Sequence, residues 1–303
     1  MSKEMKPKLS QEEADQLPWQ KVGKVSFVWV YPVKSCAPLD VSEAYTDPHC
    51  LTSSNIRDRC LMLASPKGNM ITGRMVGSTV LIKPQVDGDN LTLSFPEKDP
   101  LHIDLKSVIQ HRTIFNTEVW GEKVTGLDCG DEAAQWLNSV LKRDARLLYH
   151  ADIPSPRVTK DPEGKWPLLR DDDNSMYADL TAYMLMTQSS LDDLQSRVNV
   201  SISPKDFRPN IFVEGTLAYE EDNWEYIKFG GAIFRNVKPC DRCIFTTIRH
   251  ETGKKDPNME PLRTLRGYRC EPGNTSPEFG INLGVDIPGT IKAGDDVYVT
   301  YKA

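Results

Sequence analysis

The sequence predicts an α+β fold of two β-rich lobes, the second built around a β-barrel with peripheral helices. A chain of 303 residues exceeds the usual size of one domain. Its strand-like runs are short and numerous, whereas few segments carry helical spacing. We expect a flexible N-terminal arm over residues 1–20, one β-rich domain over 21–152 and a barrel domain over 153–303.

The N-terminal half begins with a polar arm and continues as short strands. Ser10 and Glu13 have the spacing of a capping box before a short helix. Residues 25–31 are β-branched and aromatic almost throughout, which predicts a buried strand that ends at Pro32. Further strands, joined by tight turns and mostly antiparallel, are predicted at 60–64, 79–83, 91–95, 112–115 and 123–125.

The C-terminal half begins after the clearest helix signal. Residues 131–143 combine helical spacing with an acidic first turn and a basic last turn. Residues 152–174 lack periodicity and are expected to cross between the lobes. A second helix is predicted to begin at Ser190, and strands are predicted at 212–214, 226–229, 232–234, 244–247 and 297–301.

Charge and cysteine content exclude several classes of protein. The net charge of −6 comes from mixed acidic and basic residues, which argues against a nucleic-acid-binding face. Seven cysteines without a secretory signal indicate a reducing, intracellular compartment. The longest apolar stretch, 25–33, is too short to span a bilayer, so a soluble chain is expected.

Cys240 and Cys243 flank Arg242 in the stretch where we expect the chemistry. We expect Cys243 at a loop-to-strand junction, where the neighbouring cation favours the thiolate. The pair could be half of a zinc site completed by His250 and Cys270, a redox dithiol, or two cysteines without a role. The residues alone leave these three readings open.

Three clusters of cations could converge on an anion. They are Lys34 with Ser35, Arg57 with Arg59, and Arg208 within residues 207–210. Arginine forks match phosphate bidentately, and side chains at strand ends can meet in space. The alternative is that these cations are solvated or paired, since Asp58 lies between two of the arginines.

Four motifs together resemble the mitochondrial amidoxime-reducing component family, molybdenum-cofactor proteins of the MOSC superfamily. The resemblance runs in one order from about Val22 to Tyr298. The motifs are Tyr31-Pro-Val-Lys34-Ser35-Cys36, Asn55-Ile-Arg57-Asp58-Arg59, Asp206-Phe-Arg208-Pro209-Asn210 and Cys240-x-Arg242-Cys243-x-x-Thr246-Thr247. By this resemblance the lobes are a MOSC N-terminal domain and a MOSC β-barrel.

The resemblance also implies a set of site residues. Cys243 would be the catalytic residue and the single protein thiolate on molybdenum, while Cys240 would stay unligated. The phosphate end of the pterin would be held by Lys34, Ser35 and Arg59. Other residues lining the cofactor would be Asp179, Thr181, Arg208, Asn210, Asp241, Arg242 and, where the family has an aromatic residue, Asn282. The sequence departs from the family again at Ile248-Arg249-His250, which replaces Val-Asp-Pro.

The implied activity is the reduction of amidoximes, hydroxylamines and N-hydroxyguanidines to the parent amines or amidines by oxygen-atom transfer. Electrons would come from cytochrome b5 and its NADH-dependent reductase. The family location is the mitochondrial outer membrane facing the cytosol, through an N-terminal anchor that this sequence does not show. One alternative is a molybdenum-cofactor or sulfur carrier without its own reductase activity, and another is a zinc-stapled binding protein.

Overall fold

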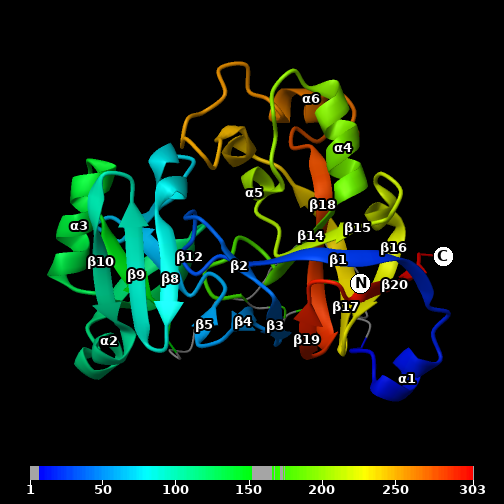
Figure 1. Ribbon diagram of the computed structural model, residues 1–303, viewed down its shortest axis with the longest axis horizontal. Coiled ribbons are helices and arrows are strands. Elements are labelled where there is room, and N and C mark those ends of the chain that lie inside the picture. The colour runs from blue at the N-terminus through cyan, green and yellow to red at the C-terminus, as the bar shows by residue number, and fades with distance from the viewer. Residues whose placement is uncertain (1–6, 152–165, 167, 171–172, 174, 303) are drawn as a thin grey trace.

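The computed structural model describes residues 7–151, 166, 168–170, 173 and 175–302. Two β-rich lobes lie side by side, with helices at their outer faces (Figure 1). The lobe drawn mainly in cyan and green comes from the N-terminal half, and the other contains a closed barrel. The predicted α+β fold with two lobes and a C-terminal barrel is therefore confirmed.

Seven strands form the barrel. Their order is β15 (Ile211–Glu214), β14 (Tyr183–Thr187), β18 (Glu278–Ile287), β17 (Ala232–Asp241), β16 (Trp224–Phe229), β20 (Asp296–Tyr301) and β1 (Gln20–Val30). β1 pairs with β15 and closes the ring, while β2 (Leu39–Val41) is added beside β1. β14 and β15 are parallel, so a helical crossover joins them, made of α4 (Gln188–Arg197) and α5 (Pro204–Phe207).

The N-terminal lobe contains two antiparallel sheets. One is the meander β8 (Lys83–Asp87), β9 (Asn90–Phe95) and β10 (Lys98–Asp104). The other has the order β11 (Ile114–Val119), β12 (Glu122–Asp128), β13 (Arg146–Tyr149), β6 (Leu61–Ala64) and β7 (Met70–Ile71). The helices α2 (Leu105–His111) and α3 (Asp131–Leu141) lie on this lobe (Figure 1).

A small sheet joins a strand from the C-terminal part of the chain to three strands from the N-terminal part. Its order is β19 (Gly289–Lys292), β3 (Glu43–Thr46), β4 (Leu51–Ser53) and β5 (Ile56–Arg57). β19 comes from the C-terminal part of the chain and the other three strands from the N-terminal part, so the lobes share hydrogen bonds as well as side-chain contacts.

Local capping signals explain where the helices begin. Ser10 and Glu13 form the predicted capping box of α1 (Gln11–Asp15). The helix predicted at 131–143 is confirmed as α3, but it ends at Leu141, because Lys142 has a left-handed backbone and is the C-cap residue. α4 begins before the predicted Ser190, because the Thr187 side chain accepts a hydrogen bond from the Ser190 backbone N–H and acts as the N-cap. The strand predicted at 79–83 is wrong, since most of it is the 3-10 helix η1 (Gly77–Leu81), with Thr79 Oγ1 donating to the Val76 carbonyl.

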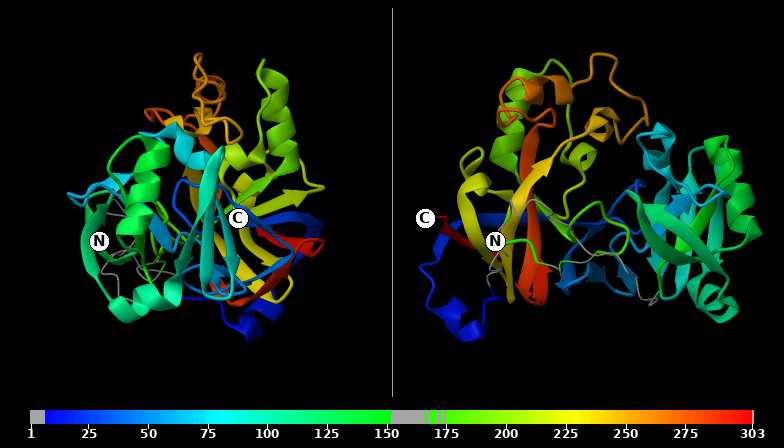
Figure 2. Two further views of the ribbon diagram at one scale, coloured as in Figure 1. Left: turned by 60° about the vertical axis from the view of Figure 1, so that its left-hand side comes forward. Right: turned by 180° about the vertical axis from the view of Figure 1, so that it is seen from behind.

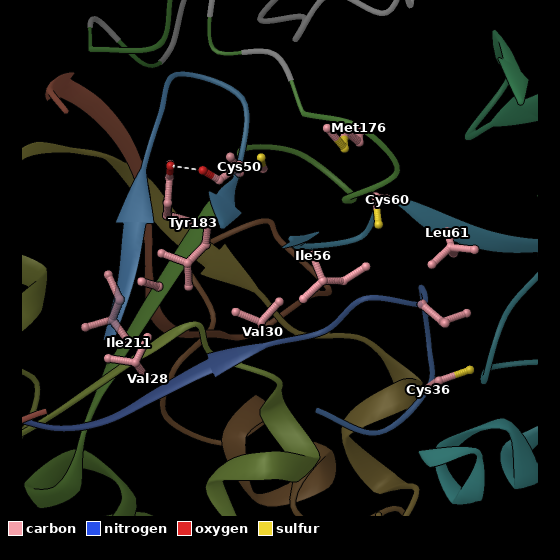
Figure 3. Close-up of a cluster of buried hydrophobic side chains, with 14 of the residues drawn as sticks. Val28, Val30, Cys36, Cys50, Ile56, Cys60, Leu61, Met176, Tyr183 and Ile211 are labelled. Carbon is pink, nitrogen blue, oxygen red and sulfur yellow. Dashed lines mark hydrogen bonds between the residues drawn. The ribbon is translucent and has the colours of Figure 1, made fainter. Parts of the chain in front are cut away.

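The apolar core is continuous across both lobes. Figure 3 shows Val30 of β1 close to Ile56 of the small sheet and Val28 beside Ile211 of β15, with Tyr183 of β14 nearby. The Tyr183 hydroxyl donates to the Cys50 carbonyl, so its polar end is satisfied where the ring is buried. The lobes therefore share one core rather than packing as independent units.

The predicted domain boundary at 152/153 lies at the edge of residues outside the described part of the chain, as does most of the predicted crossing at 152–174. The boundary stays a prediction. The predicted N-terminal domain includes β1, whereas the hydrogen bonds of β1 place it in the barrel sheet. The right-hand panel of Figure 2, seen from behind, shows this blue strand in the far wall of the barrel.

A buried ion network fastens the barrel to the segment before β14. The Arg235 guanidinium, fully buried on β17, donates to Asp173 and Asp286 and also to the Leu168 carbonyl at 2.8 Å. Arg170 donates to Asp286 at 2.6 Å. A buried ion pair adds little net stability, but the loss of one partner leaves an uncompensated charge in the core.

We therefore expect Arg235→Met to lower the free energy of unfolding by about 3–5 kcal/mol, because Asp173 and Asp286 would stay buried without their main partner. Urea denaturation followed by tryptophan fluorescence measures the change. The control is Arg197→Met, which removes an exposed ion pair to Asp193 and should change stability little. Equal effects of the two substitutions would contradict the prediction.

Candidate functional site

A cavity of about 540 Å³ lies where the mouth of the barrel meets the N-terminal lobe. All the residues that the sequence analysis assigned to the site line this one cavity: Lys34, Ser35, Arg59, Asp179, Thr181, Arg208, Asn210, Asp241, Arg242, Cys243 and Asn282. They come from segments separated by more than two hundred positions in the chain. The folded chain thus gathers the predicted residues, while their individual roles stay predictions.

Cys243 lies between the end of β17 and the 3-10 helix η3 (Ile244–Thr247), of which it is the N-cap residue. The strand predicted at 244–247 is therefore wrong, and so is the loop-to-strand junction. The Thr246 and Thr247 hydroxyls donate to the carbonyls of Cys243 and Ile244, at 3.0 and 2.7 Å. Such local bonds compete with a strand despite the β-branched composition.

Arg242, the residue before Cys243, fixes this turn through hydrogen bonds to neighbouring elements. Its side chain is buried, and its Nε donates to the Phe279 carbonyl at 2.7 Å while Nη1 donates to the Phe207 carbonyl at 3.0 Å. Burial lowers the pKa of Arg242, and burial raises the pKa of the Cys240 thiol. The Arg242 guanidinium therefore donates mainly to backbone carbonyls. These bonds hold the Cys243 turn against β18 and α5.

Two arginines gather around Tyr31. The guanidinium carbons of Arg59 and Arg208 lie 4.4 and 4.2 Å from the centre of its ring. Arg59 donates to Asp58 and, at 3.0 Å, to Asn210 Oδ1. The predicted alternative of an ion pair thus holds for Asp58 and Arg59, although both side chains are largely buried rather than solvated.

Arg208 has a different environment. Its Nη1 donates to the Cys36 carbonyl at 2.6 Å, whereas its buried Nη2 has no hydrogen-bond partner among the described residues. Burial lowers the pKa of Arg208 to about 10, and the nearby Arg59 acts in the same direction. An anion in the cavity would supply the missing acceptor.

Lys34 and Asp179 form a pair at the side of the cavity near the N-terminal lobe. The buried Lys34 ammonium donates to Asp179 and to the Tyr177 carbonyl. Trp120, at the β11–β12 turn, donates its indole N–H to Asp179 at 2.9 Å, and Arg74 lies over the Trp120 ring at 4.1 Å. The protein surroundings disfavour the charged carboxylate, but Lys34, Trp120 and Arg74 outweigh this and lower the pKa of Asp179.

Three residues of the cavity have a left-handed backbone that glycine usually adopts: Ser35, Arg59 and Arg208, with φ of 71°, 48° and 63°. Each such residue costs free energy, and the surrounding contacts must maintain it. Asn210 helps to do so, since its Nδ2 donates to the Trp29 carbonyl at 3.2 Å and its Oδ1 receives Arg59.

The remaining predicted residues also make polar contacts within the protein. Asn282 Nδ2 donates to the Pro239 carbonyl at 3.3 Å, Thr181 Oγ1 donates to the Tyr183 carbonyl at 3.1 Å, and Asp241 pairs with Lys238. Sequence reasoning missed several residues that line the cavity from both lobes: Thr72, Arg74, Trp120, Trp166, Lys238 and Phe245. A tryptophan at a hairpin turn, before Gly121, is the one local signal that singles out Trp120.

The zinc reading finds no support in the described residues, where no group of three or more His, Cys, Asp or Glu side chains could hold a metal ion. His250 contacts Asp206 at 2.8 Å instead of joining the cysteine pair. Cys36, Cys50 and Cys60 are buried in the core.

Within the part of the chain that the structure describes, no helix has both the length and the apolar character needed to cross a bilayer.

Comparison with known proteins identifies the class. Residues 22–144 match the MOSC N-terminal beta barrel domain, and residues 172–298 match the MOSC domain. The protein is thus a two-part MOSC protein. The chain is 38% identical over 286 residues to mitochondrial amidoxime-reducing component 1 of Homo sapiens. The aligned region covers 92% of this chain and 84% of the relative. It is 37% identical to mitochondrial amidoxime reducing component 2 of Bos taurus, with the same coverage. The chain belongs to the mitochondrial amidoxime-reducing component family, and the resemblance read from the four motifs is confirmed.

The close approach of the lobes at the cavity predicts the effect of one substitution. A Cβ added at Gly73 would lie 2.0 Å from the nearest atom of the Phe245 ring. Phe245 lines the cavity, and the centre of its ring lies 5.3 Å from the guanidinium carbon of Arg208. We expect Gly73→Ala to lower stability by about 1–3 kcal/mol, as overpacking does. Urea denaturation tests this, with Gly231→Ala as the control because its added Cβ has no neighbour within 4 Å. A neutral Gly73→Ala would show that the lobes separate freely at this contact.

Proposed function

We propose that the protein is a molybdenum-cofactor enzyme that reduces N-hydroxylated compounds such as amidoximes, hydroxylamines and N-hydroxyguanidines. The observation that carries the proposal is one cavity that contains both a thiol, Cys243, and an arginine, Arg208, with a buried donor that has no partner among the described residues. Membership of the amidoxime-reducing component family supports it.

The donor set fits the cofactor. Molybdenum takes a soft sulfur ligand, which Cys243 can provide from the tip of a braced turn. The cofactor ends in a phosphate, and planar guanidinium forks match phosphate oxygens. Among the described residues neither Arg208 nor Arg242 forms an ion pair with a carboxylate, so the cavity has positive charge that an anionic cofactor would balance.

The proposed assignments follow from these contacts. Cys243 would ligate molybdenum, while Lys34, Ser35 and Arg59 would hold the phosphate and Arg208 would supply its free N–H. The contacts that would line the cofactor elsewhere involve Asp179, Thr181, Asn210, Asp241 and Asn282. When bound, the cofactor supplies the two-electron chemistry that removes the N-bound oxygen.

The polypeptide would contribute placement and charge. Arg242 keeps the Cys243 turn fixed through its carbonyl contacts, so the Cys243 sulfur is held in one position. Asp179, held by Lys34 and Trp120, keeps an anionic oxygen at one side of the cavity, where it would attract a protonated amidine product. We further propose cytochrome b5 and its NADH-dependent reductase as the electron source, at the mitochondrial outer membrane.

The first test compares the two cysteines. Cys243→Ser should abolish both bound molybdenum and benzamidoxime reduction, because a hydroxyl is a poor ligand for the metal. Cys240→Ser is the matched control and should retain both. Elemental analysis and turnover with reconstituted cytochrome b5 and reductase measure the two properties.

Other results would overturn the proposal in distinct ways. One equivalent of zinc without molybdenum would support the zinc-stapled alternative. Bound molybdenum without turnover by the unaltered protein would support a cofactor or sulfur carrier.

The second test concerns cofactor retention. Arg208→Met removes charge-assisted hydrogen bonds and should weaken cofactor binding by roughly ten- to a hundredfold. The control is Arg112→Met, since Arg112 also has a left-handed backbone, with φ of 49°, but is exposed at the end of α2. Pterin and molybdenum content after dialysis is the measurement, and equal retention by the two variants would contradict the role of Arg208.

A further inference from the structure

The segment that follows η3 is basic, although the chain as a whole is acidic. Residues 249–269, here called the basic segment, contain six Lys and Arg and three Asp and Glu, in a chain of net charge −6. Four of the basic side chains are exposed: Lys254, Lys255, Arg263 and Arg266. Among the described residues no carboxylate lies within ion-pair distance of Lys254 or Lys255.

Backbone contacts fix the first part of this segment in place. Ile248 and Lys255 form an antiparallel bridge, and the Arg249 N–H donates to the Lys254 carbonyl at 3.0 Å. The Asp256 N–H donates to the Thr247 carbonyl at 2.8 Å. The two lysines are therefore presented by an ordered hairpin rather than by a free loop.

The hairpin also reaches the N-terminal lobe. A Cβ added at Gly253 would lie 2.9 Å from the Ser78 Cα, which shows that the turn abuts η1. In Figures 1 and 2 the segment is the orange loop that arches from the barrel towards the other lobe. Its start lies beside the cavity, because the His250 ring contacts Asp206, which lines the cavity, at 2.8 Å.

We propose that the basic segment is the docking surface for an acidic electron-carrier protein. The inference rests on the proposed function, which requires electrons from outside the chain. Each docking delivers one electron, so two carriers are each oxidised by one electron. With two protons they convert one N–OH group to N–H and water. Complementary charge steers such brief encounters and raises their association rate.

An acidic protein fits this surface better than an anionic membrane. Surfaces that lie on membranes combine cations with large apolar side chains that enter the lipid. The exposed large hydrophobic residues of the described chain are Phe27, Tyr45, Met75, Ile109, Ile114, Trp120, Leu217 and Tyr301, and none belongs to the basic segment. The surface thus has the charge for either partner but lacks the groups that would insert into a bilayer.

The test is the double substitution Lys254→Glu with Lys255→Glu in the cofactor-loaded protein. The probe is the reduced haem domain of cytochrome b5, which is acidic. We expect the KM for this donor to rise by roughly tenfold or more, and the salt dependence of the rate to flatten. Benzamidoxime reduction driven by dithionite should not change, because it needs no protein donor.

The matched control is Lys142→Glu with Arg143→Glu, two adjacent exposed cations at the end of α3 on the far side of the N-terminal lobe. It makes the same change of net charge and should leave the KM for the donor nearly unchanged. An equal rise in KM for the two variants, or no rise for the first, would overturn the proposal.

Two further results separate other causes. If the unaltered protein showed no dithionite-driven turnover, the proposed function would be rejected rather than the docking surface. Sedimentation with phosphatidylserine-containing vesicles, lost in the Lys254/Lys255 variant while donor kinetics stay unchanged, would assign the surface to a membrane and overturn the docking proposal.

Discussion

The cations around Tyr31 impose the main constraint on this structure. Arg59 and Arg208 contact the same ring, and one carboxylate, Asp58, pairs with Arg59. Burial raises the pKa of Asp58 while Arg59 opposes that shift, so the pair is held together against the cost of desolvation. The carbonyl contacts and left-handed turns nearby all serve to bring these charges close without a full set of counter-ions. The result is a cavity lined by more basic than acidic side chains.

That constraint requires both lobes. Arg59 follows β5 but donates to Asn210 just before β15 of the barrel, and Trp120 reaches Asp179 from a hairpin of the other lobe. Gly73 leaves the space that Phe245 fills. Because the apolar core is also continuous, neither lobe could hold the cavity alone.

Sequence reasoning recovered the fold and the residues of the cavity to different depths. Hydrophobic pattern and capping signals located α1, α3 and most barrel strands, since these depend on local sequence. The same reasoning failed at residues 244–247, where Thr246 and Thr247 bond to the local backbone although their composition favours a strand. The cations of the cavity were recognised from motifs read jointly. Arg74 and Trp120 escaped notice because their position depends on how the lobes meet, which no local pattern contains.

The place of β1 in the barrel has a consequence for synthesis of the protein. The ring closes only when β1, the barrel strand made first, pairs with β15 and with β20, the barrel strand made last. A growing chain must therefore keep this strand of 11 residues, the last three of which are buried in the folded protein, without one of its neighbours until β20 has been made. Both edges of β1 are prone to wrong pairing during that interval. Assembly of the barrel is thus timed by β20, and loss of that strand would leave β1 without a partner on one side.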